Sequence, residues 1–264
     1  MDLNKIDAST KINPLAKEIK LGFDSKQQQK AVLLLHGFGG KSNNWSYTAK
    51  KINKTLSLPV YVPRLPGHGT NINDFLNSNA DQWLRKAVDS YLYLKNDFQE
   101  IYLAGISMGG LLAALIASKF EIKKLSLVAP AFFTKDKNIV FTPYIKHFIK
   151  KIDNNFKLDQ ENLSDAEIDF HKNYSFNYYT EALAELYKLI KKARQAVDNI
   201  KTETQLILST NDQQVATNKI KTFLNENMGQ FLTDQKIYQK SSHVIINDLE
   251  KERCAQDIIN FFNK

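Results

Sequence analysis

The sequence predicts an α/β fold in which a mostly parallel central sheet carries helices on both faces. Short apolar runs alternate with segments of helical periodicity along the chain, which is the pattern of parallel strands joined by crossover helices. The 264 residues, 43% hydrophobic and 24% charged, fit one large domain with a substantial core. No internal repeat, long linker or low-complexity tract divides the sequence, so we expect a single domain over residues 1–264.

Seven short apolar runs predict strands. In chain order they are EIKLGF (18–23), AVLLLHGF (31–38), PVYVPRL (59–65), IYLAGI (101–106), KLSLVAPAF (124–132), TQLILST (204–210) and QKIYQK (235–240). Helices are predicted around 45–57, 81–97, 108–119, 180–199, 216–226 and 249–262. The helix at 180–199 is the clearest, because its apolar residues recur at helical spacing and fall on one face. These residues are Leu183, Leu186, Leu189, Ile190, Ala193 and Val197.

The segment 133–179 interrupts this alternation. No strand is predicted there, yet aromatic residues are dense, and TPYIKHFIKKI and part of SDAEIDFHKNY have amphipathic helical spacing. An insertion of this length in a compact domain is usually a lid or a binding element. We therefore predict a cap over residues 133–179, and a small satellite core is the alternative interpretation. The candidate substrate-binding residues are Phe133, Tyr144, Phe176 and Tyr178.

The net charge of +8 comes overwhelmingly from lysine, and the lysines are scattered along the chain as pairs. Nucleic-acid recognition favours arginine forks and clustered patches, so we expect no nucleic-acid partner. The composition favours a solvated basic surface, and weak contact with an anionic surface is the alternative. The oligomeric state is expected to be a monomer or a homodimer.

The chain contains no apolar run of the roughly 18–20 residues that cross a bilayer. Its start, MDLNKIDASTKINPLAKEIK, lacks the apolar stretch of a secretory signal. The single cysteine, Cys254, can form no internal disulfide, which agrees with a reducing compartment. We expect a cytoplasmic protein without an integral membrane segment. One cysteine also excludes a cysteine-built metal site, and no three-ligand cluster of His, Asp and Glu stands out, so we expect no metal.

The pentapeptide GISMG, residues 105–109, lies between an apolar run and a helical segment. Its two glycines leave room where a strand turns sharply into a helix, and such a turn projects the hydroxyl of Ser107 above the sheet. The N-terminus of the following helix directs its N–H groups toward a developing negative charge. The pattern predicts that Ser107 is a nucleophile; an ordinary small residue in a tight turn is the alternative.

A serine nucleophile needs a base, and the base needs an orienting acid. Among the five histidines, His243 lies between the last predicted strand and the last predicted helix, where it can return over the sheet. Asp212 follows the apolar strand LILST, and the carboxyl ends of parallel strands share one edge. Asp234 and Asp248 are possible substitutes for the acid, but neither follows a core strand.

A tetrahedral intermediate needs two donors for its oxyanion. One candidate is the backbone N–H of Met108, and the other is the N–H of Phe38 in HGFGG, where the glycines let the backbone approach a substrate. The spacing of HGFGG does not fit a phosphate-binding loop. His36 and His68 each precede a glycine in a loop that leaves a strand, so we expect both to hydrogen-bond loop backbone.

Together, LLLHGFGG, LPGHG, GISMGG, STND and SSHVI resemble the serine esterase branch of the α/β-hydrolases, in particular small-capped bacterial carboxylesterases and monoacylglycerol lipases. The resemblance spans about residues 30–264. It implies the α/β-hydrolase fold with a small helical cap after the sixth strand, and no cofactor. It also implies a Ser107, Asp212 and His243 triad, in the chain order of that superfamily, with oxyanion donors at Phe38 and Met108.

Two departures from the group are visible. Ser242 stands before the histidine where the group commonly has glycine, and the insertion matches poorly in detail. The resemblance implies a serine carboxylesterase that hydrolyses short- to medium-chain esters or monoacylglycerols through an acyl-enzyme, on a small lipophilic substrate. The alternatives are a thioesterase or another reaction of the same triad, or a non-catalytic ligand-binding protein of the same fold.

Overall fold

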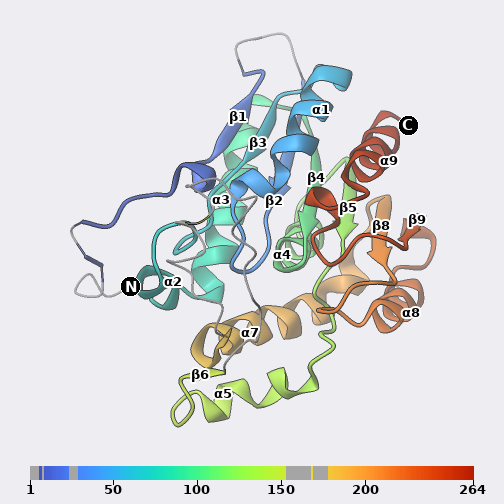
Figure 1. Cartoon of the computed structure of the whole chain (residues 1–264). Coiled ribbons are helices and arrows are strands. Elements are labelled where there is room, and N and C mark those ends of the chain that lie inside the picture. Colours follow the sequence, from blue (N-terminus) through green and yellow to red (C-terminus); the bar gives the residue numbers. More distant parts are fainter. Residues whose placement is uncertain (1–5, 8, 24–28, 153–167, 169–177) are drawn as a thin grey trace.

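A seven-stranded sheet with the order β1-β3-β2-β4-β5-β8-β9 lies at the centre of the part of the chain that the computed structural model describes, residues 6–7, 9–23, 29–152, 168 and 178–264 (Figure 1). The strands are β1 (Ile19–Leu21), β2 (Lys30–Leu35), β3 (Val60–Val62), β4 (Glu100–Ile106), β5 (Lys124–Val128), β8 (Thr204–Ser209) and β9 (Leu232–Tyr238). Only β1 runs antiparallel to its neighbour. All seven predicted strands are confirmed.

Helices cover both faces of the sheet. They are α1 (Ser46–Leu56), α2 (Ile72–Leu76), α3 (Ala80–Asp97), α4 (Met108–Ala117), α5 (Thr142–Ile145), α7 (Thr180–Ala196), α8 (Thr217–Met228) and α9 (Lys251–Asn263). Right-handed crossovers place α3 and α4 on one face and α1 on the other, where α1 contacts α9. Each predicted helix is present. Among the helices of the described residues, none combines the length and the hydropathy of a membrane-spanning segment.

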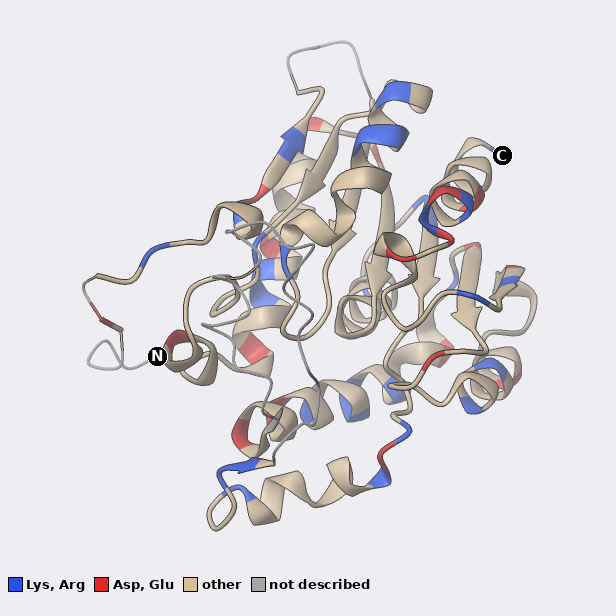
Figure 2. Cartoon of the chain, in the orientation of Figure 1, with Lys and Arg blue, Asp and Glu red and all other residues tan. Residues whose placement is uncertain are grey.

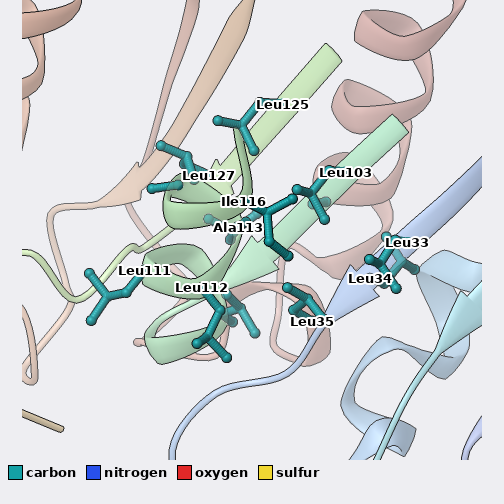
Figure 3. Packing of buried hydrophobic residues seen from close by; sticks show 14 of the residues in the cluster. Leu33, Leu34, Leu35, Leu103, Leu111, Leu112, Ala113, Ile116, Leu125 and Leu127 are labelled. Atoms are coloured by element: carbon teal, nitrogen blue, oxygen red, sulfur yellow. The ribbon is translucent and has the colours of Figure 1, made fainter. Parts of the chain in front are cut away.

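The core around β4 and α4 explains why these elements are almost entirely apolar. Every residue of β4 from Ile101 to Ile106 is buried, because both faces of this strand are covered. Figure 3 shows Leu111, Leu112, Ala113 and Ile116 of α4 together with Leu103 of β4 and Leu125 and Leu127 of β5. A helix that is apolar all round needs cover all round, and α4 obtains it from the sheet, α3 and α7.

The turn from β4 into α4 depends on two glycines. A Cβ on Gly105 would lie 2.1 Å from the carbonyl oxygen of Gly109, and a Cβ on Gly109 would lie 2.1 Å from the carbonyl oxygen of Leu35 in β2. Both distances are far shorter than real Cβ contacts, so only glycine fits at either position. The first turn of α4 therefore touches the backbone of β2 directly.

The segment 133–179 follows β5 and contains both helix and strand in its described parts. A 3-10 helix, η4 (Lys137–Phe141), leads into α5, and β6 (Lys151–Ile152) pairs antiparallel with β7 (Tyr178–Tyr179). The expectation that no strand lies here is wrong, because two-residue strands are too short to produce a period in the sequence. The predicted helix in TPYIKHFIKKI ends at Ile145 and turns follow.

Among the described strands, five precede this segment, β1 to β5 in chain order; the resemblance places the cap after the sixth strand by the family's own count. Residues 153–167 and 169–177, which include most of the predicted helix in SDAEIDFHKNY, lie outside the described residues.

We predict that Gly109→Ala destabilises the fold by about 3 kcal/mol or more, because the added methyl group overlaps the backbone of β2 at the centre of the core. The control is Gly39→Ala, whose Cβ would meet nothing within 4 Å but whose backbone is left-handed, with φ +62°. This variant should lose only about 1–2 kcal/mol. Urea-induced unfolding of both variants measures the difference, and equal losses would contradict the packing argument.

Candidate active site

The carboxyl ends of β4, β5, β8 and β9 meet at one edge of the sheet. Backbone hydrogen bonds continue past the strand ends, in order Ser107 N to Val128 O at 3.0 Å, Ala129 N to Ile207 O at 2.8 Å and Thr210 N to Tyr238 O at 2.9 Å. Ser107 follows β4, Asp212 follows β8 and His243 follows β9. The sheet therefore delivers the three predicted residues to the same edge.

Ser107 has a strained backbone between β4 and α4. Its angles are φ 55° and ψ −119°, a combination that residues with a Cβ rarely adopt. The chain uses nearly the same angles at Gly229, with φ 53° and ψ −124°, where no Cβ is present. The carbonyl oxygen of Ser107 accepts from Gly110 N at 3.0 Å and from Ala131 N at 3.1 Å, so bonds from two segments hold the strained unit in place.

The loop after β2 touches Ser107. A Cβ on Gly37 would lie 3.2 Å from Ser107 Cβ and 3.7 Å from its Oγ. Among the described hydrogen bonds, the backbone N–H groups of Phe38 and Met108 have no acceptor. Met108 is the first residue of α4, and the first N–H groups of a helix have no partner within it. Two donors are thus available in the two segments that meet at Ser107.

His243 and Asp212 form a buried pair. His243 Nδ1 lies 2.7 Å from Asp212 Oδ2, and both side chains are buried. The other carboxylate oxygen, Oδ1, accepts from the N–H groups of Gln214 at 2.7 Å and Val215 at 3.0 Å. A carboxylate held in this way keeps the imidazole proton on Nδ1 and leaves Nε2 as the basic atom.

The carboxyl group of Asp212 stays ionised at neutral pH. Burial acts to raise its pKa, but the hydrogen bond and charge of His243, together with the two backbone N–H groups, outweigh burial and lower the pKa below its ordinary value. The alternative acids lie elsewhere: Asp234 accepts from Gln205 Nε2 at 2.8 Å, and Asp248 accepts from Ser242 N at 2.6 Å. Of the three carboxylates, Asp212 therefore binds the histidine.

Two carboxylates anchor the loop of His243, a role that the sequence analysis assigned to neither of them. Asp248 accepts from both the N–H and the hydroxyl of Ser242 at 2.6 Å, and Glu250 accepts from Ser241 N at 2.9 Å. The hydroxyl of Ser242 thus has a defined partner at the position where the resembling group has glycine. The sequence held one signal for this role, because Ser241 and Ser242 offer backbone N–H groups and the next carboxylates along the chain are Asp248 and Glu250.

Two buried histidines hold the loop that carries Phe38. Each ring donates from Nδ1 to a carbonyl oxygen and accepts a backbone N–H at Nε2, as only a neutral imidazole can. The bonds are His36 Nδ1 to Gly37 O at 3.0 Å, Leu65 N to His36 Nε2 at 3.2 Å, His68 Nδ1 to Pro66 O at 3.0 Å and Gly39 N to His68 Nε2 at 3.2 Å. The expectation that both histidines bond loop backbone is confirmed.

Burial keeps both rings uncharged. Burial, with a smaller contribution from the charge of Arg64, lowers the pKa of His36 to about 4, against the opposing effect of the bond to Gly37. Burial and the neighbouring His36 hold the pKa of His68 well below its usual range. Protonation of His68 would turn Nε2 from an acceptor into a donor and break the bond to Gly39, which is next to Phe38.

The predicted substrate-binding residues are placed differently from one another. Phe133 is half-buried, and the guanidinium of Arg194 lies 3.8 Å from the centre of its ring. Tyr144 lies on the outside of α5 and is 74% exposed. The backbone of Tyr178 belongs to β7, whereas Phe176 and the side chain of Tyr178 lie outside the described residues.

Other reactive groups lie apart from this edge. Cys254 is buried in α9, and burial raises the pKa of its thiol, which disfavours the thiolate. Within the described ranges, no group of three or more His, Cys, Asp and Glu side chains could hold a metal ion.

The sheet order and the sharp turn at Ser107 define the chain as an α/β-hydrolase. Residues 26–250 match the model of the Hydrolase_4 family, described as serine aminopeptidase, S33, and the chain belongs to this family. It is a hydrolase, and the predicted fold class and resemblance are confirmed.

Related proteins agree with this class. A carboxylesterase of Bacillus subtilis is 26% identical over 249 residues, which are 92% of this chain and 96% of the relative. A thermostable monoacylglycerol lipase of Bacillus sp. strain H-257 is 36% identical over 86 residues, 33% of this chain and 34% of the relative.

Two solved structures share the fold. A structure from work on the metagenome-derived lipolytic enzymes LipS and LipT has a TM-score of 0.80 at 19% identity, covering 96% of this chain and 99% of that chain. The monoacylglycerol lipase of Paleococcus ferrophilus has a TM-score of 0.67 at 17% identity, covering 92% of this chain and 96% of that chain.

We predict that Ser107→Gly folds more stably than Ser107→Ala by about 1 kcal/mol, because glycine releases the backbone strain that any Cβ retains, partly offset by the freedom of glycine in the unfolded chain. The matched pair is Ser118→Gly and Ser118→Ala at the end of α4, where φ is −73° and alanine should be the more stable. Thermal unfolding measures both differences. If alanine is the more stable residue at position 107 as well, the turn at Ser107 stores no backbone strain.

We predict that folding stability falls as the pH drops from about 6.5 toward 4. The unfolded chain binds a proton at His36 near its ordinary value of 6.5, whereas the folded protein binds it only near 4. Over that window His36 alone removes about 3 kcal/mol, at about 1.4 kcal/mol per pH unit. Urea unfolding across the window measures the slope, and imidazole ¹⁵N shifts identify the ring. A His36 ring that titrates at its ordinary value in the folded protein would contradict the argument.

Proposed function

We propose that the protein is a serine carboxylesterase that hydrolyses short- to medium-chain carboxylic esters or monoacylglycerols through an acyl-enzyme. The observation that carries this proposal is the 2.7 Å bond between buried His243 and Asp212, at the sheet edge where the strained turn presents Ser107. The names of the relatives, carboxylesterase and monoacylglycerol lipase, support esters as the class of substrate.

In the proposed acylation step, Ser107 Oγ attacks the carbonyl carbon of the ester while its proton passes to His243 Nε2. Asp212 stabilises the imidazolium that forms. The oxyanion accepts hydrogen bonds from the N–H groups of Phe38 and Met108, which have no other described acceptor. When the bond to the alcohol oxygen breaks, His243 gives the proton to that oxygen and the acyl group remains on Ser107.

In the proposed deacylation step, water attacks the acyl carbon and gives a proton to His243. The bond to Ser107 Oγ then breaks, and His243 returns the proton to the serine. One ester and one water become one alcohol and one carboxylic acid. Within the described residues, Ser107 Oγ and His243 Nε2 form no hydrogen bond, and such contacts often tighten only with substrate in place.

We assign the segment 133–179 as a cap that borders this site. Its first residues are tied to the loop of Asp212, because Thr134 pairs with Val215 and Ala216 N donates to Phe133 O at 2.8 Å. This position, and the half-buried ring, support Phe133 as a contact for the acyl group. The outward position of Tyr144 does not add support for it, so its role stays a prediction.

We predict that Asp212→Asn lowers kcat by about 10⁴-fold, because the amide no longer holds the histidine in the tautomer that accepts the serine proton. Asp248→Asn is the matched control, since that carboxylate binds Ser242 and not His243; it should keep most of the activity. Initial rates on p-nitrophenyl butyrate compare the two.

Ser107→Ala completes this experiment. It should lose nearly all activity and, unlike the wild type, escape labelling by a fluorophosphonate. Undiminished turnover in this variant, or equal losses in Asp212→Asn and Asp248→Asn, would refute the proposed triad. Faster turnover of acyl-CoA thioesters than of oxygen esters would instead favour the thioesterase alternative.

A further inference from the structure

Exposed apolar side chains form a stripe along η4, α5, the turn that follows α5 and β6. Ile139 and Thr142 are buried on the inner side, where η4 and α5 contact α7. The exposed fractions of the stripe are Val140 38%, Phe141 55%, Tyr144 74%, Phe148 88%, Ile149 48% and Ile152 40%. The solvent face of a surface helix is normally polar. Such an inverted pattern marks an interaction surface.

Lysines flank this apolar stripe. Between residues 133 and 152 there are five lysines and one acidic residue, Asp136. The lysines are Lys135, Lys137, Lys146, Lys150 and Lys151. Figure 2 shows α5 largely uncharged between basic segments at its two ends. The surface is therefore both apolar and cationic.

Two lysines of the neighbouring helix α7 are neutralised, whereas Lys146 and Lys150 beside the stripe form no ion pair among the described residues. Lys188 and Lys192 on α7 both bridge Asp81, at 2.6 and 2.7 Å. Lys146 and Lys150, close in sequence to the exposed rings of Tyr144 and Phe148, therefore fit an anionic partner with an apolar interior.

A second copy of this chain fits the surface poorly. In a two-fold dimer the same patch meets itself, so the five lysines of each copy would face those of the other with only one acidic residue, Asp136, between residues 133 and 152 of each copy. Like-charge contacts of this kind oppose association. A lipid surface supplies phosphate groups for the lysines and hydrocarbon for the rings.

We propose that the apolar stripe and its flanking lysines dock this protein on an anionic lipid surface. The aromatic side chains enter the headgroup region, and the lysines extend their stems along it so that their ammonium groups reach lipid phosphates. Under the proposed function, docking would bring the enzyme to its substrates, since lipophilic esters collect in such surfaces. The docking itself does not require catalysis.

The chain contains one competing occupant. Residues 153–169 carry six acidic side chains and one lysine in the sequence, so this segment has the complementary charge. The experiment must therefore distinguish vesicles from a covering segment of the same chain.

The test is co-sedimentation with vesicles of phosphatidylcholine alone or mixed with phosphatidylglycerol, at low and high salt. Ser107→Ala is used beside the wild type, so that binding is measured without turnover. Lys146→Gln with Lys150→Gln should weaken partition into anionic vesicles by about 20- to 30-fold, and Phe148→Ser by about tenfold or more. The matched controls are Lys50→Gln with Lys54→Gln on α1, at the same spacing, and Leu249→Ser, a side chain 78% exposed; neither should change partition.

Thermal unfolding and turnover of a water-soluble ester should be unchanged in all four of these variants. Salt-sensitive binding that needs phosphatidylglycerol and both parts of the surface supports the proposal. No vesicle binding, or binding that survives both surface variants, overturns it while leaving the proposed esterase intact. A dimer in sedimentation velocity that Phe148→Ser dissolves overturns it in favour of a second copy.

A fluorophore attached to the cysteine of a Phe148→Cys variant tests whether the chain covers this surface itself. Emission that shifts to the blue on addition of anionic vesicles supports docking. Emission that is already blue without vesicles, and does not respond to them, shows that the chain covers this surface itself and overturns the proposal.

Discussion

The contact between the first turn of α4 and the backbone of β2 is the constraint on which the site depends. Gly109 allows this contact, since a Cβ there would lie 2.1 Å from Leu35 O. The contact brings the loop after β2 beside the turn at Ser107 and so places Phe38 N–H and Met108 N–H in adjoining segments. The strained angles of Ser107 follow from the same geometry, because a helix that starts so close to the sheet leaves no room for a gradual turn.

The buried loop histidines and the buried Asp212 have opposite tendencies to carry charge. His36 and His68 are buried with carbonyl and N–H partners, which suit a neutral ring, and burial lowers the pKa of each. Asp212 is also buried, but its partners are His243 and backbone N–H groups, which suit a carboxylate. Burial disfavours the charged form of each group. At Asp212 the hydrogen-bond partners outweigh burial, whereas at the loop histidines burial outweighs the other effects, so the hydrogen-bond partners decide which group is charged.

Most of the fold could be predicted because strands covered on both faces appear as continuous apolar runs, as β4 does, and because long helices such as α7 repeat their apolar face several times. The positions of Ser107, Asp212 and His243 followed from the shared carboxyl edge of parallel strands. β6 and β7 could not be predicted, since two residues show no period. The anchoring of the histidine loop by Asp248 and Glu250 depends on where a turn folds back, which spacing alone does not determine.

The described part of the segment 133–179 is tied to the rest of the molecule at both ends. At its start, Thr134 pairs with Val215, whose N–H also donates to Asp212 Oδ1 at 3.0 Å. At its far end, Thr180 of α7 donates from its N–H to Lys150 O at 3.2 Å and from its hydroxyl to Ile149 O. If the exposed stripe moves relative to α7, either the backbone of residues 135–149 changes its conformation or the loop of Asp212 moves with the stripe. The segment that carries the apolar stripe is thus connected to Asp212 through two residues, Val215 and Gln214, because Lys135 N donates to Gln214 O at 2.9 Å and Gln214 N donates to Asp212 Oδ1 at 2.7 Å.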